Sequence, residues 1–205
     1  QFSESVPKKV EEALQELKEK EVEGLILDLR NNSGGLVSSG IAVADSLLSE
    51  KPVVETKDRN GIKDAIISQK ETSFDGPMVT LVNKGTASAS EILAGSLQDN
   101  ERSILMGEQT YGKGLIQSLK SLGEDSGIAI TVASYLTPNG NNIQGQGITP
   151  DKLLDLVDTS EYGSSDDKWV RNAELFLESL LEKKEVSNED NEFKSEETIN
   201  VVAKD

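Results

Sequence analysis

The sequence predicts an α/β fold in which helices flank a largely parallel central sheet. Two almost continuously apolar segments, "GLILDLR" (24–30) and "PMVTLVN" (77–83), are typical of strands that are covered on both faces, as in a parallel sheet. A helical pattern follows each segment, and the strand, helix and strand predicted over residues 77–108 indicate a crossover unit. The chain of 205 residues is long enough for one such domain with a sizeable core.

The first part of the chain gives clear element signals. Residues 5–20 are predicted to form a surface helix, because apolar residues recur at helical spacing between charged ones. After the strand at 24–30, the turn "NNSGG" (31–35) leads into a second helix that extends to about residue 48. Residues 52–68 are predicted to form two strands around an Asn-Gly turn, which is a strong hairpin signal.

The rest of the chain continues this alternation and ends in a polar tail. The predicted elements are a strand at 77–83, a helix at about 88–98, strands at 103–108, 114–122 and 127–138, and a closing helix at about 167–182. Residues 184–205 are charged and polar with little periodicity, so we expect them to be mostly disordered. The predicted domain therefore spans residues 1–183.

The composition excludes several classes of function. A net charge of −16 opposes binding to nucleic acid or to an anionic membrane, because both need a basic surface patch. With no histidine and no cysteine, the chain cannot build a Ser-His-Asp triad, a cysteine nucleophile, a disulfide or a conventional zinc site. No apolar segment reaches the roughly 18 residues that a membrane-spanning helix needs. If the protein is a hydrolase, its general base must be another type of residue.

The segment "NKGTASASEILAG" (83–95) places three hydroxyls where a predicted strand gives way to a helix. Ser88 and Glu91 fit the capping-box pattern S-x-x-E, in which the serine caps the helix and the glutamate reaches back. The same position suits a nucleophile, because a serine on a tight strand-to-helix turn exposes its hydroxyl beside amides that can hold an oxyanion. The residues by themselves favour the cap and leave the nucleophile open.

Lys113, within "TYGKGLIQ" (110–117), is the candidate general base. A lysine accepts a serine proton only as the neutral amine, which requires burial to lower its pKa from about 10.4 toward 7 or 8. The two flanking glycines would let the backbone bend and bring the lysine close to another segment. A lone lysine in a loop is more often a solvated surface charge, so the residues by themselves favour that interpretation.

Four motifs occur in order along the chain: "GLILDLRNNSGGL", "VNKGTASASEILAGSLQD", "GEQTYGKGLIQ" and "YLTPNGNNIQGQGITPD". Together they resemble the C-terminal processing peptidases, or tail-specific proteases, which are serine endopeptidases with a Ser-Lys dyad. The resemblance covers about residues 1–180. It implies a crotonase/Clp-protease-like core and cleavage of proteins near their C-termini through an acyl-enzyme. It implies no metal and no organic cofactor.

The resemblance also implies roles for individual residues. Ser88 becomes the nucleophile, Lys113 the general base and Gln117 the residue that orients the lysine, while Ser90 and Thr86 become structural. In one extended strand Lys113 and Gln117 would lie about 13 Å apart, so we expect the glycines to bend the strand.

The resemblance further implies an oxyanion hole made by the backbone amides of Gly34 and Ala89. The two glycines of "NNSGG" would also suit a turn that needs positive φ, and both interpretations can hold together. Ser33 stands where the family usually has proline, and we expect this difference to leave the Gly34 amide available.

Members of this family usually carry a PDZ domain ahead of this region and a strand that ends near the "QF" with which the chain opens. We therefore expect this chain to be a slow, poorly selective peptidase with an unpaired sheet edge near residues 24–30. We also expect it to associate with itself or with a missing N-terminal segment. The implied partners are protein or peptide substrates with exposed C-terminal tails, and the implied location is extracytoplasmic: the periplasm, the cell envelope or the thylakoid lumen.

Two other classes of function remain alternatives. A non-catalytic core of the same fold could capture protein tails or act as a scaffold, but it would have no need of Ser88, Lys113 and Gln117 together. An acyl-CoA enzyme of the related crotonase architecture would also use paired amides as an oxyanion hole. The serine and lysine within the family motifs weigh against that alternative.

Overall fold

The computed structural model of the chain describes residues 1–69, 71–123, 126–155 and 162–183. The predicted disordered tail at 184–205 lies outside these residues. Each helix and strand predicted within them is present, with ends shifted by a few residues.

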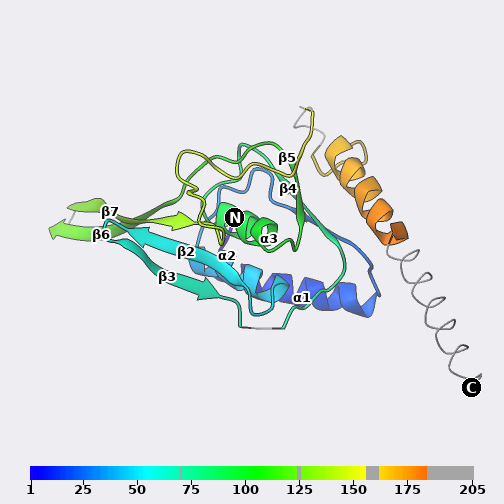
Figure 1. The fold of residues 1–205 in the computed structure, drawn as a ribbon, viewed down its shortest axis with the longest axis horizontal. Coiled ribbons are helices and arrows are strands. Elements are labelled where there is room, and N and C mark those ends of the chain that lie inside the picture. Colours follow the sequence, from blue (N-terminus) through cyan, green and yellow to red (C-terminus); the bar gives the residue numbers. More distant parts are fainter. Residues whose placement is uncertain (70, 124–125, 156–161, 184–205) are drawn as a thin grey trace, which may run out of the picture.

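Two four-stranded sheets form the framework (Figure 1). In the first sheet all pairs are parallel and the order is β1-β4-β5-β8. These strands are β1 (Leu25–Asp28), β4 (Met78–Val82), β5 (Ile104–Gly107) and β8 (Lys152–Leu153). This sheet confirms the predicted parallel centre, and its edge strand β1 pairs only with β4 among the described residues, as expected for residues 24–30.

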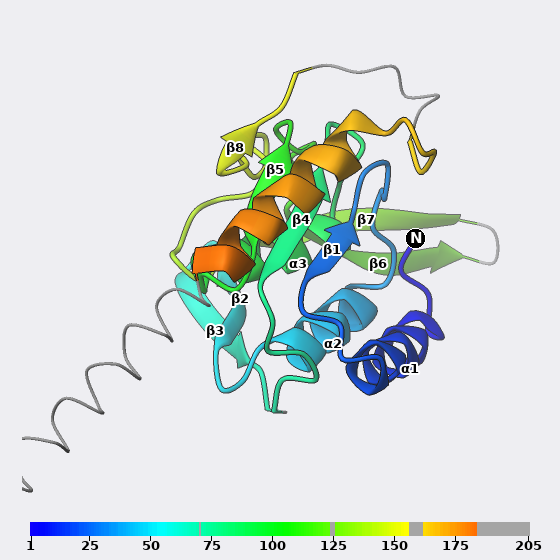
Figure 2. The same cartoon turned by 90° about the vertical axis from the view of Figure 1, so that its right-hand side faces the viewer.

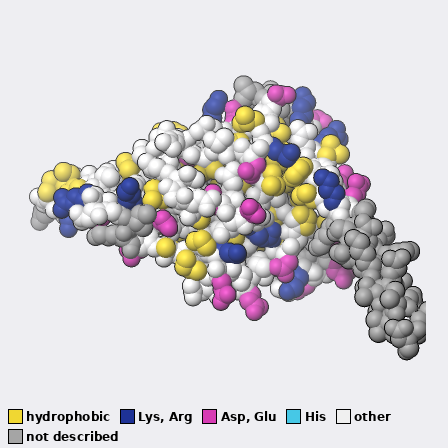
Figure 3. Space-filling model, in the orientation of Figure 1, with side chains coloured by type: hydrophobic (Ala, Val, Ile, Leu, Met, Phe, Trp, Pro, Cys, Tyr) yellow, Lys and Arg dark blue, Asp and Glu magenta, His cyan; other side chains and the backbone are white. Residues whose placement is uncertain are grey.

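The second sheet is antiparallel, with the order β3-β2-β7-β6. Its strands are β2 (Pro52–Asp58), β3 (Gly61–Ile67), β6 (Leu115–Gly123) and β7 (Ser126–Leu136). The hairpin of β2 and β3 was predicted from its Asn-Gly turn, but the pairing of β2 with β7 was not. Strands β6 and β7 extend beyond the body of the molecule, and Figure 3 shows hydrophobic side chains exposed toward their tip.

Helices cover both faces of the parallel sheet (Figure 2). The helices are α1 (Val6–Glu19), α2 (Val37–Leu47), α3 (Ala89–Asp99) and a closing helix over residues 168–183, drawn in orange. All five residues of β4 are buried. Met78 and Val82 face the core shared with α2 and α3, while Val79 and Leu81 pack with Trp169 of the closing helix. Burial on both faces explains why this strand is apolar at four of its five positions; the exception, Thr80, shares a hydrogen bond with Ser103.

Gly107 ends β5 at a point where a side chain has no room. Its φ is 131°, and a Cβ there would overlap the Val82 carbonyl oxygen and lie 2.9 Å from Cζ3 of Trp169. Gly140 also has positive φ, 80°, but a Cβ there would meet no atom within 4 Å.

We expect Gly140→Ala to lower the free energy of unfolding by about 1–2 kcal/mol, from backbone strain alone. Gly107→Ala should cost about 1–3 kcal/mol more, because overpacking adds to the strain. Urea unfolding followed by the fluorescence of Trp169, the single tryptophan, measures both values. Equal losses in the two variants would contradict the close packing at Gly107.

Candidate active site

Ser88 occupies the N-cap position of α3, at the end of the turn that leaves β4. Its backbone has φ 57° and ψ −120°, a left-handed conformation that is costly for any residue but glycine. The Glu91 half of the predicted capping box is present, since its carboxylate accepts the Ser88 amide at 2.9 Å, yet cap residues ordinarily have extended backbone. A half-buried serine strained on a strand-to-helix turn has the geometry of a nucleophile elbow.

The hydroxyls of Thr86 and Ser90 are both fully buried, and that of Ser90 has no hydrogen-bond partner among the described residues. Thr86 donates its hydroxyl to the carbonyl of Leu29 at 2.8 Å and accepts the amide of Asn83 at 3.0 Å. Ser90 is completely buried within α3. A substrate therefore cannot reach either hydroxyl from solvent.

The glycine turn, residues 31–35, packs directly against Ser88. A Cβ placed on Gly34 would lie 2.8 Å from Cβ of Ser88 and 2.9 Å from the Ala89 nitrogen, and φ at Gly34 is 92°. Only glycine fits such a contact. Phe2 supports the turn from the other side, because its amide donates to the Gly34 carbonyl at 2.8 Å and its carbonyl accepts the Leu36 amide at 2.9 Å.

The two predicted oxyanion amides differ in this structure. The Ala89 amide, at the first position of α3, has no acceptor among the described residues. The Gly34 amide donates to Oδ1 of Asn32 at 3.1 Å, so this bond must be exchanged before Gly34 can hold a substrate oxygen. The structure thus places both predicted residues beside Ser88, with one amide free and one occupied.

Lys113 and Gln117 line the same cavity, which has a volume of about 550 Å³. Lys113 lies just before β6, after Gly112 with φ 89°, and β6 has a register shift between Ile116 and Gln117. Lys113 and Gln117 thus do not lie in one regular strand, and the predicted approach of their side chains stays a prediction. Both side chains are exposed, so the burial that was expected for Lys113 is not supplied by the described residues.

The cavity lies next to the serine turn. Its walls include Ser33 of the glycine turn and Ala87, which immediately precedes Ser88, although Ser88 itself is not a lining residue. Tyr111 and Leu115 contribute apolar surface on the side of the lysine.

Glu91 joins the serine segment to the lysine segment, a role that the sequence did not reveal. The side chain is fully buried, and its Oε2 accepts the amides of Ser88 at 2.9 Å and Lys113 at 2.8 Å. Its Oε1 accepts the Thr110 hydroxyl at 2.5 Å and the Gly112 amide at 2.6 Å. The capping box was the only signal for this residue, and it indicated one of these four bonds.

The described residues contain no group of three or more Asp, Glu, His or Cys side chains that could hold a metal ion. Among their helices, none is both long and apolar enough to cross a membrane.

A family model, relatives in sequence and a solved structure all match this chain to C-terminal processing peptidases or their family. The model of peptidase family S41 matches residues 1–154. A carboxyl-terminal-processing protease of Synechocystis sp. is 49% identical over 169 residues, which cover 82% of this chain and 40% of the relative. A carboxy-terminal processing protease of Bacillus subtilis is 38% identical over 158 residues, which cover 77% of this chain and 34% of the relative.

A solved structure, the photosystem II D1 C-terminal processing protease, superposes with a TM-score of 0.73 at 44% sequence identity. The match covers 75% of this chain and 40% of that one. The chain thus spans about two fifths of the length of the Synechocystis relative and of the D1 processing protease.

We expect Glu91→Gln to lower the free energy of unfolding by at least about 2 kcal/mol. One carboxylate oxygen becomes an NH₂ group that faces backbone donors and leaves them unpaired. Glu16→Gln, at an exposed position of α1, serves as the control and should change stability little. Denaturant unfolding of the three proteins gives the comparison, and equal stability of both variants would contradict the bridging role of Glu91.

Proposed function

Because the chain belongs to peptidase family S41, we propose that it carries the catalytic site of a serine endopeptidase that cleaves proteins near their C-termini. Ser88 is the nucleophile and Lys113 the general base. The observation that carries this proposal is the Glu91 carboxylate, which holds the amides of Ser88 and Lys113 on one oxygen atom. A structural cap alone gives no reason for the lysine segment to be fixed at the same place.

The proposed reaction proceeds in two stages. Oγ of Ser88 attacks the scissile carbonyl carbon while Nζ of Lys113 takes the hydroxyl proton, and the Ala89 and Gly34 amides stabilise the oxyanion. Collapse of the intermediate breaks the C–N bond, and Lys113 returns the proton to the leaving amine. Water, deprotonated by Lys113, then hydrolyses the acyl-enzyme and restores Ser88.

Because Lys113 is exposed in this structure, we propose that the bound substrate supplies the burial that its amine needs. A peptide that occupies the cavity removes water from around the amine, and removal of water favours its neutral form. The Gln117 side chain, on the wall of the same cavity, then orients the amine toward Ser88.

The proposed substrates are proteins with exposed C-terminal tails, in an extracytoplasmic compartment. The support comes from the names of the relatives, which describe carboxyl-terminal processing and include a chloroplastic enzyme and a protease of photosystem II D1.

Ser88→Ala should abolish peptide cleavage and labelling by a serine-directed phosphonate while the fold persists, since loss of a cap costs only about 1 kcal/mol. Ser90→Ala is the matched control and should keep both activities, because Ser90 is buried within α3. Mass spectrometry of the labelled peptide locates the site. Turnover by the Ser88 variant, with the Ser90 variant inactive, would assign the nucleophile to Ser90.

Lys113→Arg should be nearly inactive, because a guanidinium group stays protonated and cannot accept the serine proton. Lys120→Arg, an exposed change in β6 beyond Lys113, should retain activity. For the unmodified chain, kcat/KM should rise with pH as the neutral amine forms. An active Lys113→Arg protein, or a flat profile between about pH 5 and 9, would refute the role of this lysine as base.

A further inference from the structure

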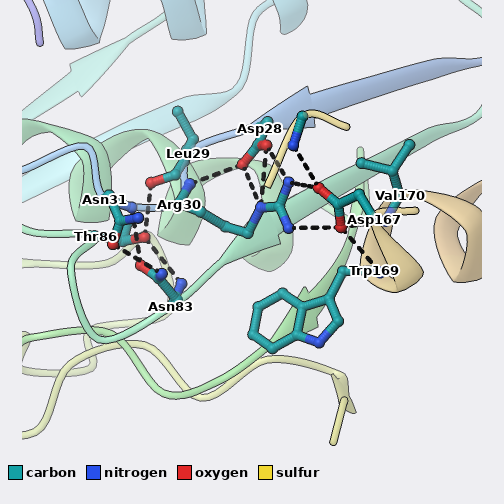
Figure 4. Close-up of polar contacts among 10 residues, drawn as sticks. Asp28, Leu29, Arg30, Asn31, Asn83, Thr86, Asp167, Trp169 and Val170 are labelled. Carbon is teal, nitrogen blue, oxygen red and sulfur yellow. Dashed lines mark hydrogen bonds and ion pairs between the residues drawn. The ribbon is translucent and has the colours of Figure 1, made fainter. Parts of the chain in front are cut away.

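Arg30 lies between β1 and the glycine turn, and its side chain is only 1% exposed. Two carboxylates hold the guanidinium group (Figure 4). Nη1 and Nη2 donate to the two oxygens of Asp167 at 3.0 and 2.6 Å, and Nε donates to Asp28 at 2.9 Å. The Tyr162 ring covers the guanidinium carbon, with 4.0 Å to its centroid.

Asp167 is fixed by its own surroundings as well. Its side chain is 1% exposed and accepts the amides of Gly163 at 2.8 Å and Trp169 at 3.1 Å, at the start of the closing helix. Burial alone would raise the pKa of this carboxyl, but the hydrogen bonds from Arg30 and from backbone amides outweigh it and lower the pKa to about 2. The carboxylate is therefore ionised under ordinary conditions.

The residues on both sides of Arg30 are hydrogen-bonded to the segment that leads to Ser88. The Leu29 carbonyl accepts the Thr86 hydroxyl at 2.8 Å, and the Asn31 amide donates to Oδ1 of Asn83 at 2.9 Å. Further along, the Asn32 carbonyl accepts the Ala87 amide at 3.1 Å. These bonds fix the position of the glycine turn relative to Ser88, and Arg30 lies in the middle of the segment that makes them.

We propose that Asp167 is a positioning residue for catalysis: through Arg30, the closing helix holds the glycine turn in register with Ser88. The proposal rests on the function proposed above, and it concerns a residue beyond position 154, where the family match ends. The stability of the fold does not by itself explain this ion pair, because apolar residues can often replace a buried ion pair without loss of folding stability. The closing helix already packs through Trp169, Ala173 and Leu177.

The test compares Asp167→Asn with Asp166→Asn, a change of the same chemistry at the exposed neighbouring position. Asparagine keeps the shape but loses the charge and one acceptor. In Asp167→Asn, phosphonate labelling of Ser88 should slow at least about tenfold in the folded protein, because small displacements at an active site reduce the rate strongly. Hydrogen exchange at the Asn31 and Gly34 amides should accelerate, and Trp169 emission should shift.

The Asp166 variant should match the unmodified chain in all three measurements. Unchanged labelling and unchanged exchange in folded Asp167→Asn would overturn the proposal, even if stability fell. If the unmodified chain is not labelled, the proposed function fails, and the exchange measurement still decides whether Asp167 positions the turn.

Asp167→Glu covers the case in which the asparagine variant does not fold. It keeps the charge but moves the carboxylate by one methylene, so labelling should slow and exchange at the glycine turn should rise. Labelling and exchange equal to those of the unmodified chain in this variant would overturn the proposal.

Discussion

The candidate active site depends on one buried carboxylate. Glu91 lies in the first turn of α3 with no exposed surface, and it accepts four hydrogen bonds from two segments of the chain. A buried carboxylate with fewer partners would be costly, so the four bonds form or are lost together. The backbone of Ser88 and the backbone of Lys113 consequently cannot move independently. Their side chains remain accessible to substrate, because the constraint acts through the amides.

A second buried charge constrains the other half of the site. The glycine turn is held on one side by Phe2 and through Arg30 by Asp167, and it contacts Ser88 so closely that Gly34 can carry no side chain. The proposed site thus draws on three segments, one with Ser88 and Ala89, one with Gly34 and one with Lys113, and each is tied to the framework by buried polar contacts. Such support is what fixes catalytic groups within fractions of an ångström.

Local patterns predicted most of the fold, and contacts distant in sequence explain what they missed. The apolar run of β4 and the Asn-Gly turn at residues 60–61 are local patterns of a few residues, so both elements could be predicted. The pairing of β2 with β7 joins residues such as Glu55 and Leu136, and no local pattern encodes that register. The Arg30–Asp167 pair spans 137 positions and gave no signal in the sequence for the same reason.

The roles of the site residues were predicted from the family resemblance, and the structure adds the buried hydrogen bonds that hold their backbone segments in place. Their roles can be tested most directly by the structure of this chain with a peptidyl phosphonate bound. The account predicts phosphorus bonded to Oγ of Ser88, a phosphonyl oxygen within hydrogen-bond distance of the Ala89 and Gly34 amides, and Nζ of Lys113 within hydrogen-bond distance of Oγ. An adduct on another residue, or an adduct on Ser88 with Lys113 directed to solvent and another group in its place, would contradict it.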